Sequence, residues 1–295
     1  MVDIDQPAVD AMIALLDLEP IEVNIFRGAV SPDRGDQRVF GGQVAGQALV
    51  AAARTVDPPQ VVHSLHAYFL RPGDPSIPII YEVDRTRDGR SFSTRRVKAV
   101  QHGRSIFTLS ASFQAPEDGF DHSFAMPAGL AEPEMLPDFK ERMAPYREQL
   151  GGYYERPRPI DTRYCEANPW ERPEDLPPFQ NVWLRANGTL PDDPLLHICV
   201  LTYASDMTLL DTSLQPHGSR FTVGEVFMAS LDHAMWFHRP FRSDEWLLYA
   251  QDTPSASGGR GLGRGLVYSR DGRLVASVVQ EGLIRPMRSH QEGDR

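Results

Sequence analysis

The sequence predicts an α+β protein in which one domain plan occurs twice, as two tandem antiparallel sheets each wrapped around a central helix. The strongest observation is an internal repeat: residues 63–72 and 231–240 both end in an aromatic residue, one variable residue, Arg and Pro. Each copy is followed by an extended stretch, a Gly-Arg step at 89–90 or 259–260, a polar turn and a last apolar run. Such self-similarity at one spacing is typical of a duplicated architecture.

The first copy contains two helical patterns ahead of its strands. Apolar residues at helical spacing predict a short amphipathic helix over residues 8–17. The segment 38–53 is apolar on almost every side and rich in small residues, which indicates a buried helix that a sheet can approach closely. Short connections favour antiparallel pairing of the strands that follow. These strands are predicted over residues 63–70, 77–85, 91–100 and 106–113.

A long connector separates the copies. Residues 115–195 contain 13 of the 25 prolines and show weak periodicity, so we expect irregular structure with at most short helices near 137–150. The second copy then repeats the order, with a helix around 206–214 ahead of its strands. These strands are expected around 226–237, 245–252, 264–269 and 274–283.

The resulting domain organisation has four parts. They are an N-terminal domain with its own first helix (1–115), a Pro-rich connector (116–180), a C-terminal domain that carries the candidate catalytic residues (181–286) and a polar tail (287–295).

Composition restricts the function classes. A net charge of -10 argues against a broad nucleic-acid surface, which needs a basic patch. Only Cys165 and Cys199 are present, too few for a disulfide framework or a zinc cluster, and this suits a reducing compartment. The N-terminus is acidic and no apolar run approaches the roughly 20 residues that span a bilayer. We therefore expect a cytoplasmic protein without a stable membrane anchor.

One carboxylate is a candidate for chemistry because the copies differ there. Asp206 follows Ser205 at the predicted start of the second helix, where backbone N–H groups favour negative charge. A carboxylate in a first helical turn often only stabilises the helix, and that interpretation stays open. The first copy has Gly42 and Gln43 at the corresponding place, so a carboxylate stands opposite an amide. Such asymmetry is what a single active site in a duplicated fold would produce.

A serine hydrolase triad is not predicted, although Ser230, Asp232 and His233 are neighbours. Successive side chains of a strand point to opposite faces, so contiguous residues cannot form a nucleophile, base and orienter relay. The chain also lacks the G-x-S-x-G elbow of α/β-hydrolases. Ser230 alone could still hydrogen-bond a water or a carboxylate.

Gln280 ends an apolar strand, where a buried glutamine would need partners for both its oxygen and its amide. A role in a polar network and a place at a sheet edge remain equally open. Metal motifs and phosphate loops are absent from the sequence, so no cofactor is predicted.

The stretch 85–104 carries seven basic residues and one acidic residue, in contrast to the acidic chain. It could attract a phosphate-rich anion, although alternating charge on the wet face of a sheet explains it nearly as well.

These motifs closely resemble the bacterial acyl-CoA thioesterase II family, whose members have a double hotdog fold. The resemblance covers nearly the whole chain, from short motifs at 18–22 and 26–28, Arg-Val-Phe-Gly-Gly-Gln at 38–43 and the first repeat at 63–73 to four motifs in the second half. Those four are Tyr-Ala-Ser-Asp at 203–206, Gln-Pro-His-Gly at 215–218, the second repeat from 232 to 241, and Val-Gln-Glu-Gly at 279–282. Several long motifs in the same order make the resemblance specific.

The resemblance implies hydrolysis of medium to long acyl-CoA to free acid and CoA. The family's Asp, Thr and Gln fall on Asp206, Ser230 and Gln280, with Ser230 in place of the usual Thr. Asp206 would then act as general base on a water held by the other two side chains, without a covalent intermediate. Homo-oligomers, dimers or tetramers, would form from hotdog sheets that associate edge to edge.

Substrate contacts are expected in the first copy. Backbone N–H groups of Gly42 and Gln43 are candidates for oxyanion stabilisation. Arg90, Arg95 and Arg96 are the candidates for the CoA phosphates.

Two alternatives remain on the same fold. Double hotdog enoyl-CoA hydratases resemble this chain in plan, but they carry a His a few positions after the Asp of the helix, and residues 206–212 contain none. A non-catalytic acyl-CoA binding module is the other, because fold alone does not fix function.

Overall fold

The structure is a computed structural model that describes residues 5–30, 38–167, 174–220 and 225–287. The predicted polar tail lies outside the described residues except for Met287. The first copy contains the helices α1 (Gln6–Leu16) and α2 (Gly41–Ala53). Its strands are β1 (Glu19–Glu22), β2 (Ile25–Gly28), β3 (Val61–Phe69), β4 (Ile79–Asp88), β5 (Phe92–Gln101) and β6 (Arg104–Gln114). The predictions of the first helix, the central helix and the four strands β3 to β6 are confirmed, with small differences at the ends.

The connector contains short helices, and the second copy follows it. The connector helices are η1 (Pro133–Met135), α3 (Phe139–Met143), η2 (Ala144–Tyr146), α4 (Arg147–Leu150) and η3 (Gly151–Tyr153). The helices of the second copy are α5 (Pro194–Ser205) and η4 (Leu210–Arg220). Its strands are β7 (Ile160–Tyr164), β8 (Phe179–Ala186), β9 (Val226–Ser230), β10 (Asp232–Phe237), β11 (Leu247–Ser257), β12 (Arg260–Ser269) and β13 (Leu274–Pro286).

The second central helix lies earlier than predicted. It is α5, which ends at Ser205. The expected helix at 206–214 is not an α-helix: Asp206 is the C-terminal cap of α5, and the 3₁₀ segment η4 begins at Leu210. The sequence analysis assigned the start of this helix to the irregular connector because the segment is rich in proline. Pro194 occupies the first helical turn, where proline is accepted, and Asp193 caps it by accepting a hydrogen bond from the Leu195 N–H at 2.9 Å.

Each copy also has two strands that the sequence analysis did not predict. The hairpin β1–β2 pairs with β4, and β7–β8 pairs with β11 at the opposite end of the sheet. The strand β7 lies inside the predicted connector, so the sheet of the second copy begins before the expected boundary at 181. Short strands flanked by prolines give little alternation for a pattern to detect.

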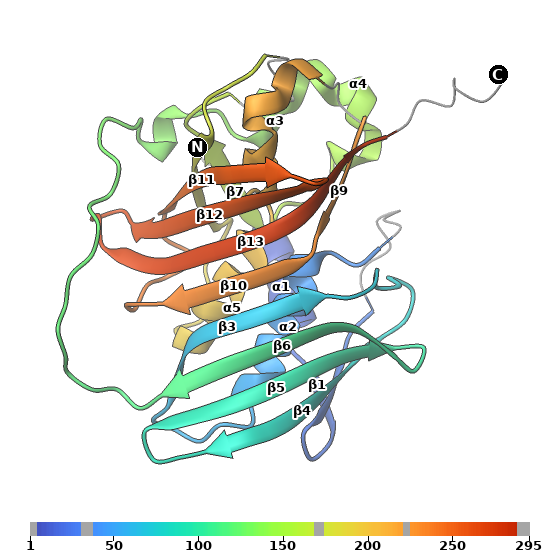
Figure 1. The fold of residues 1–295 in the computed structure, drawn as a ribbon, viewed down its shortest axis with the longest axis vertical. Helices are drawn as coiled ribbons and strands as arrows, with labels where there is room; N and C mark the ends of the chain where they lie inside the picture. Colours follow the sequence, from blue (N-terminus) through green and yellow to red (C-terminus); the bar gives the residue numbers. More distant parts are fainter. Residues whose placement is uncertain (1–4, 31–37, 168–173, 221–224, 288–295) are drawn as a thin grey trace.

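The two expected sheets are joined into one (Figure 1). The strand order is β1-β2-β4-β5-β6-β3-β10-β13-β12-β11-β8-β7, with β9 also paired to β13. The antiparallel pair β3–β10 makes the junction, and His66 stands opposite Ala234, the residue at the same place in the second repeat. A pseudo-twofold axis therefore passes through this pair. The edge strands β3 and β10 form backbone hydrogen bonds with each other within one chain, so neither edge is left unpaired.

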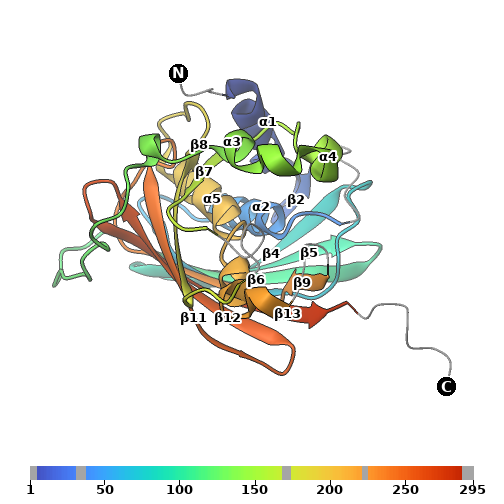
Figure 2. The same cartoon turned by 90° about the horizontal axis from the view of Figure 1, so that it is seen from above.

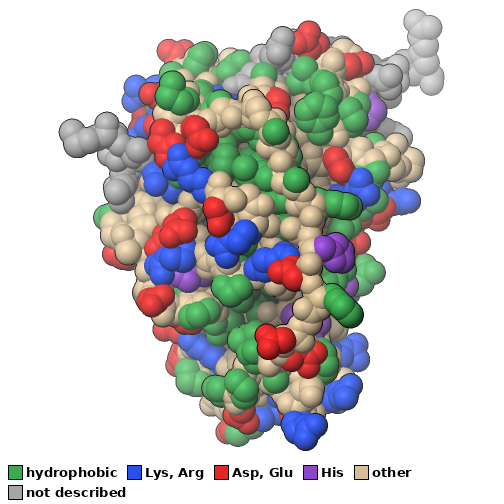
Figure 3. Space-filling view, turned by 90° about the vertical axis from the view of Figure 1, so that its left-hand side faces the viewer, with side chains coloured by type: hydrophobic (Ala, Val, Ile, Leu, Met, Phe, Trp, Pro, Cys, Tyr) green, Lys and Arg blue, Asp and Glu red, His purple; other side chains and the backbone are tan. Residues whose placement is uncertain are grey.

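The helices α2 and α5 lie between the curved sheet and an outer layer of α1, α3 and α4 (Figure 2). Residues 42–52 of α2 are all buried, which confirms the prediction of a central helix apolar on every side. Figure 3 shows a face on which basic and acidic side chains are mixed. Within the described ranges, no helix is long and apolar enough to cross a membrane.

Candidate active site

Asp206 stands where the two copies meet, and three donors converge on its carboxylate. Ser230 Oγ donates to Oδ1 at 2.9 Å, and Gln280 Nε2 donates to the same oxygen at 2.5 Å. The third donor is the backbone N–H of Gly42, at the start of α2. The structure thus brings the three predicted catalytic side chains together, and it adds a contact from the first copy.

The helix geometry around Asp206 differs from the prediction. The expectation was an N-terminal position on its own helix, but Asp206 caps the C-terminus of α5. The N–H group that favours its negative charge comes instead from the N-terminus of α2, which packs antiparallel to α5. The prediction that Asp206 and Gly42 occupy equivalent places in the two copies is therefore wrong, since one follows a central helix and the other begins one.

This helix contact requires glycine at position 42. A Cβ atom there would lie 2.2 Å from the carbonyl oxygen of Tyr203 and 2.5 Å from the ring of Phe40. Only a residue without a side chain lets the start of α2 approach the end of α5 so closely. Gln43, the next residue, is also buried.

A break in the strand aims Ser230 at Asp206. The predicted strand 226–237 is divided at Leu231 into β9 and β10, and both pair with β13. Ser230 stands opposite Gly282, and Ala234 stands opposite Val279. The segment β9–β10 therefore advances four residues where β13 advances three. An extra residue of this kind is a β-bulge, which re-aims side chains next to it.

Gln280 lies on β13 and is fully buried. Its amide nitrogen donates to Asp206, whereas its Oε1 has no hydrogen-bond partner among the described residues. A buried amide oxygen without a partner is costly, so this atom is suited to accept a hydrogen bond from an ordered water, and it reaches the cavity only through Asp206 and Ser230, because Gln280 itself does not line the wall. The network interpretation of Gln280 is the one that the structure favours over the sheet-edge interpretation.

The pKa of Asp206 is raised to about 6, chiefly because burial penalises the charged carboxylate. Hydrogen bonds from Gln280, Ser230 and Gly42 lower the pKa, as does the positive charge of Arg38, but they offset burial only in part. A carboxylate with this pKa is largely ionised at neutral pH and is a stronger base than an exposed aspartate.

The neighbouring Asp232 and His233 do not form a relay with Ser230. His233 is buried and its Nε2 is 2.8 Å from Ser205 Oγ, while burial lowers its pKa to about 4. Asp232 Oδ1 accepts a hydrogen bond from the Glu281 N–H at 2.7 Å. The rejection of a serine hydrolase triad is confirmed, because these two side chains are committed elsewhere.

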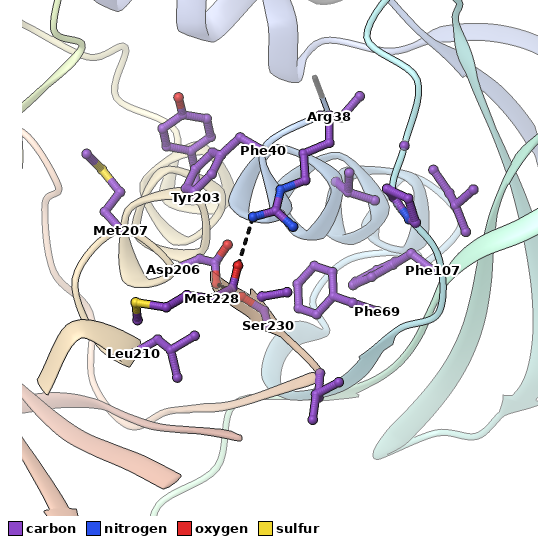
Figure 4. A pocket seen from close by; sticks show the side chains of 18 of the residues that line it. Arg38, Phe40, Phe69, Phe107, Tyr203, Asp206, Met207, Leu210, Met228 and Ser230 are labelled. Atoms are coloured by element: carbon purple, nitrogen blue, oxygen red, sulfur yellow. Dashed lines mark hydrogen bonds between the residues drawn. The ribbon is translucent and has the colours of Figure 1, made fainter. Parts of the chain in front are cut away.

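A cavity of about 770 Å³ opens beside Asp206 and Ser230 and takes its walls from both copies and the connector. Figure 4 shows Phe69 and Phe107 on one side of the two polar residues and Met207 and Leu210 on the other. Charged side chains also line the cavity, namely four arginines, Asp206 and Asp211. A cavity of this size that combines apolar walls with polar groups is typical of a small-molecule site.

The predicted phosphate contacts do not line this cavity. Arg95 is 1% exposed, and its guanidinium donates to Thr55, to backbone oxygens and to Asp88. All of its donors are therefore used inside the first domain. Arg90 and Arg96 are exposed, but neither belongs to the cavity wall.

Comparisons with known proteins show the family of this chain. The family described as acyl-CoA thioesterase matches residues 161–283, and its N-terminal domain matches residues 30–114. Acyl-CoA thioesterase 2 of Haemophilus influenzae is 43% identical over 282 residues, which cover 93% of this chain and 96% of that protein. The chain belongs to the acyl-CoA thioesterase family.

Solved structures identify the fold of this thioesterase. An acyl-CoA thioesterase II, TesB2, from Mycobacterium marinum has 49% sequence identity and a TM-score of 0.78, covering 93% of this chain and 98% of that one. A protein of unknown function with a hotdog fold from Alicyclobacillus acidocaldarius has 20% identity and a TM-score of 0.75, covering 93% and 98%. The predicted double hotdog fold is confirmed.

Proposed function

We propose that this chain hydrolyses medium to long acyl-CoA to the free acid and CoA, with Asp206, Ser230 and Gln280 as its catalytic residues. The observation that carries the proposal is the ionisable carboxylate of Asp206 on the wall of a largely apolar cavity, hydrogen-bonded by the other two side chains. Membership of the acyl-CoA thioesterase family supports the same substrate class.

In the proposed reaction, water is the nucleophile. Ser230 and Gln280 both donate to Oδ1 of Asp206, and Oδ2, which faces the start of α2, is the oxygen proposed to take a proton from a water molecule. The unpartnered Oε1 of Gln280 would help to hold that water. The hydroxide adds to the thioester carbonyl, and the tetrahedral intermediate then expels the CoA thiolate. The proton held by Asp206 passes to the departing thiolate, directly or through water, which regenerates the base.

The leaving group needs little help, because a thiol has a pKa of about 8.5 and departs readily as an anion. The oxyanion would form close to the start of α2, and the backbone of Gly42 and Gln43 at this helix N-terminus is the proposed source of stabilisation. Because the Gly42 N–H already donates to Asp206, the Gln43 N–H is the one of the two that we propose as the donor to the oxyanion.

Release of CoA thiol from acyl-CoA substrates tests the proposal. The purified chain should release thiol from substrates between C4 and C18 without added metal or cofactor, with the highest kcat/KM at medium to long chains. No release from any of them would refute it. Loss of the enoyl absorbance of crotonyl-CoA would point instead to a hydratase. Tight binding without either reaction would indicate a binding module.

A further inference from the structure

We propose that a group of arginines on the cavity wall binds the phosphate groups of CoA, with Arg71 and Arg158 as its principal members and Arg38 and Arg156 beside them. This assignment rests on the proposed function. It moves the phosphate site away from the basic stretch 85–104, whose three candidate arginines do not line the cavity. Arg38 and Arg71 are exposed, so this part of the wall is accessible from solvent.

Three separate segments supply these arginines. Arg38 precedes α2, Arg71 follows β3, and Arg156 and Arg158 belong to the stretch between η3 and β7. Four guanidinium groups therefore line one cavity in a chain whose net charge is -10. Guanidinium groups suit phosphates because their planar donors match phosphate oxygens.

The arginines of the cavity wall differ from many others in their partners. Elsewhere in the described chain, arginines such as Arg27 and Arg264 pair with carboxylates. Within the described ranges, Arg38, Arg71 and Arg158 form no ion pair with a carboxylate. Arg158 also has a buried Nε without a hydrogen-bond partner there. The positive charge of Arg38 already acts on Asp206, whose pKa it lowers, so Arg71 and Arg158 carry the charge that an anionic ligand would neutralise.

The internal repeat shows the same difference at equivalent positions. Arg71 and Arg239 are both the next-to-last residue of the repeated motif. Both donate to a backbone oxygen near the start of a neighbouring strand, Ser105 O at 2.6 Å and Leu274 O at 2.7 Å. Arg239 is also paired with Asp121 of the connector. Arg71 has no such carboxylate among the described residues and lines the cavity instead. The duplication thus provides one neutralised arginine and one available to a ligand.

Existing contacts hold these arginines in place without using all of their donors. Arg158 Nη2 donates to Tyr153 O at 3.1 Å, and its guanidinium lies 3.2 Å from the centroid of the Phe139 ring. Arg38 Nη2 donates to Met228 O at 2.8 Å, as Figure 4 shows. Side chains fixed in this way lose less conformational entropy when they bind phosphate.

Kinetics with matched substrates test the phosphate site. The same acyl group is presented on CoA and on pantetheine, which lacks the phosphates, to the wild-type chain and to Arg71→Gln and Arg158→Gln. Each substitution should raise the KM for acyl-CoA by about tenfold, because it removes hydrogen bonds to a charged group. The kcat should change less than about twofold, and the KM for acylpantetheine should not change.

Arg239→Gln and Arg96→Gln are the matched controls, since neither residue lines the cavity, and both should keep the wild-type KM. Inhibition of acyl-CoA turnover by free CoA and by pantetheine gives a second readout, in which only the constant for CoA should weaken in Arg71→Gln. An unchanged KM in both cavity variants, or equal losses with both substrates, overturns the phosphate site. A wild-type chain that hydrolyses neither substrate overturns the proposed function instead.

Discussion

At the scale of single residues, Asp206 is subject to opposing influences. Burial disfavours its charge, while two side-chain donors and a helix N–H favour it, and the balance is a pKa of about 6. A base with this pKa combines ionisation at neutral pH with a useful driving force for proton transfer. The predictions at this scale concern the base and its donors.

Replacing Asp206 by Asn should remove the base while keeping the size of the side chain. We expect kcat to fall by about 10² to 10⁴-fold, the range typical of a general base, with acyl-CoA binding largely kept. Thiol release measures the loss, and circular dichroism checks the fold. A variant with wild-type turnover would place the base elsewhere.

The pH dependence of turnover should follow the ionisation of this carboxylate. Because a base acts only when deprotonated, kcat/KM should be low below pH 6, rise through about 6 and reach a plateau above it. Rates from pH 4.5 to 8 with a stable acyl-CoA measure the midpoint. A flat profile over this range contradicts the role of Asp206.

Two substitutions at Ser230 test the role of the hydroxyl that donates a hydrogen bond to Asp206. Ser230→Thr should remain active because the hydroxyl is kept, whereas Ser230→Ala should lose about tenfold or more in kcat. Loss of the donor should also move the midpoint of the pH profile upward, because the hydrogen bond from Ser230 lowers the pKa of Asp206. An inactive Thr variant together with a fully active Ala variant would show that the hydroxyl has no such role.

At the scale of elements, the site depends on two irregular places. The bulge between β9 and β10 turns Ser230 toward Asp206, and the close contact between α2 and α5 brings the Gly42 N–H to the same carboxylate. Each element by itself is ordinary. The site arises where regular pairing or spacing is interrupted.

Two glycines of α2 provide a matched test of the helix contact. Gly42→Ala should lower the free energy of unfolding by about 1–3 kcal/mol and reduce turnover, because its Cβ would meet the backbone oxygen of Tyr203. Gly46→Ala is the control, since its Cβ would meet mainly the flexible end of Leu16, and alanine favours the helix. Urea denaturation and thiol release measure both variants. Equal effects of the two substitutions would contradict the contact.

At the scale of the whole molecule, the pair β3–β10 makes one sheet from two copies and places one cavity between them. The second copy carries Asp206, Ser230 and Gln280. The first copy provides the Gly42 N–H and the walls at Phe69 and Phe107. Neither copy contains all parts of the candidate site.

Residues 116–295 alone should therefore show no thiol release, although they contain all three proposed catalytic side chains. The fragment would lack the walls of the first copy and would expose the edge of β10. The assay compares the fragment with the full chain at equal concentration, after circular dichroism confirms that it is folded. Full activity of the fragment would show that the first copy is dispensable.

The sequence by itself determined the duplication, the central helix of the first copy and most strands, because these depend on local periodicity that a repeat shows twice. The motif resemblance also selected Asp206, Ser230 and Gln280, which the structure brings together. Asp206 was nevertheless assigned to the wrong end of a helix, because Pro194 made α5 look like connector.

Only the tertiary structure decided the partners that come from distant segments. The N–H of Gly42 at Asp206, the burial of Arg95 and the convergence of Arg38, Arg71 and Arg158 on one cavity depend on how separate elements pack. The charge pattern along the chain favoured residues 85–104 as the phosphate site. Which arginines lie at the cavity, and which are already paired within the protein, depends on residues far apart in the sequence. The physical reason is that the cavity forms between the copies, where no single stretch of sequence contains both walls.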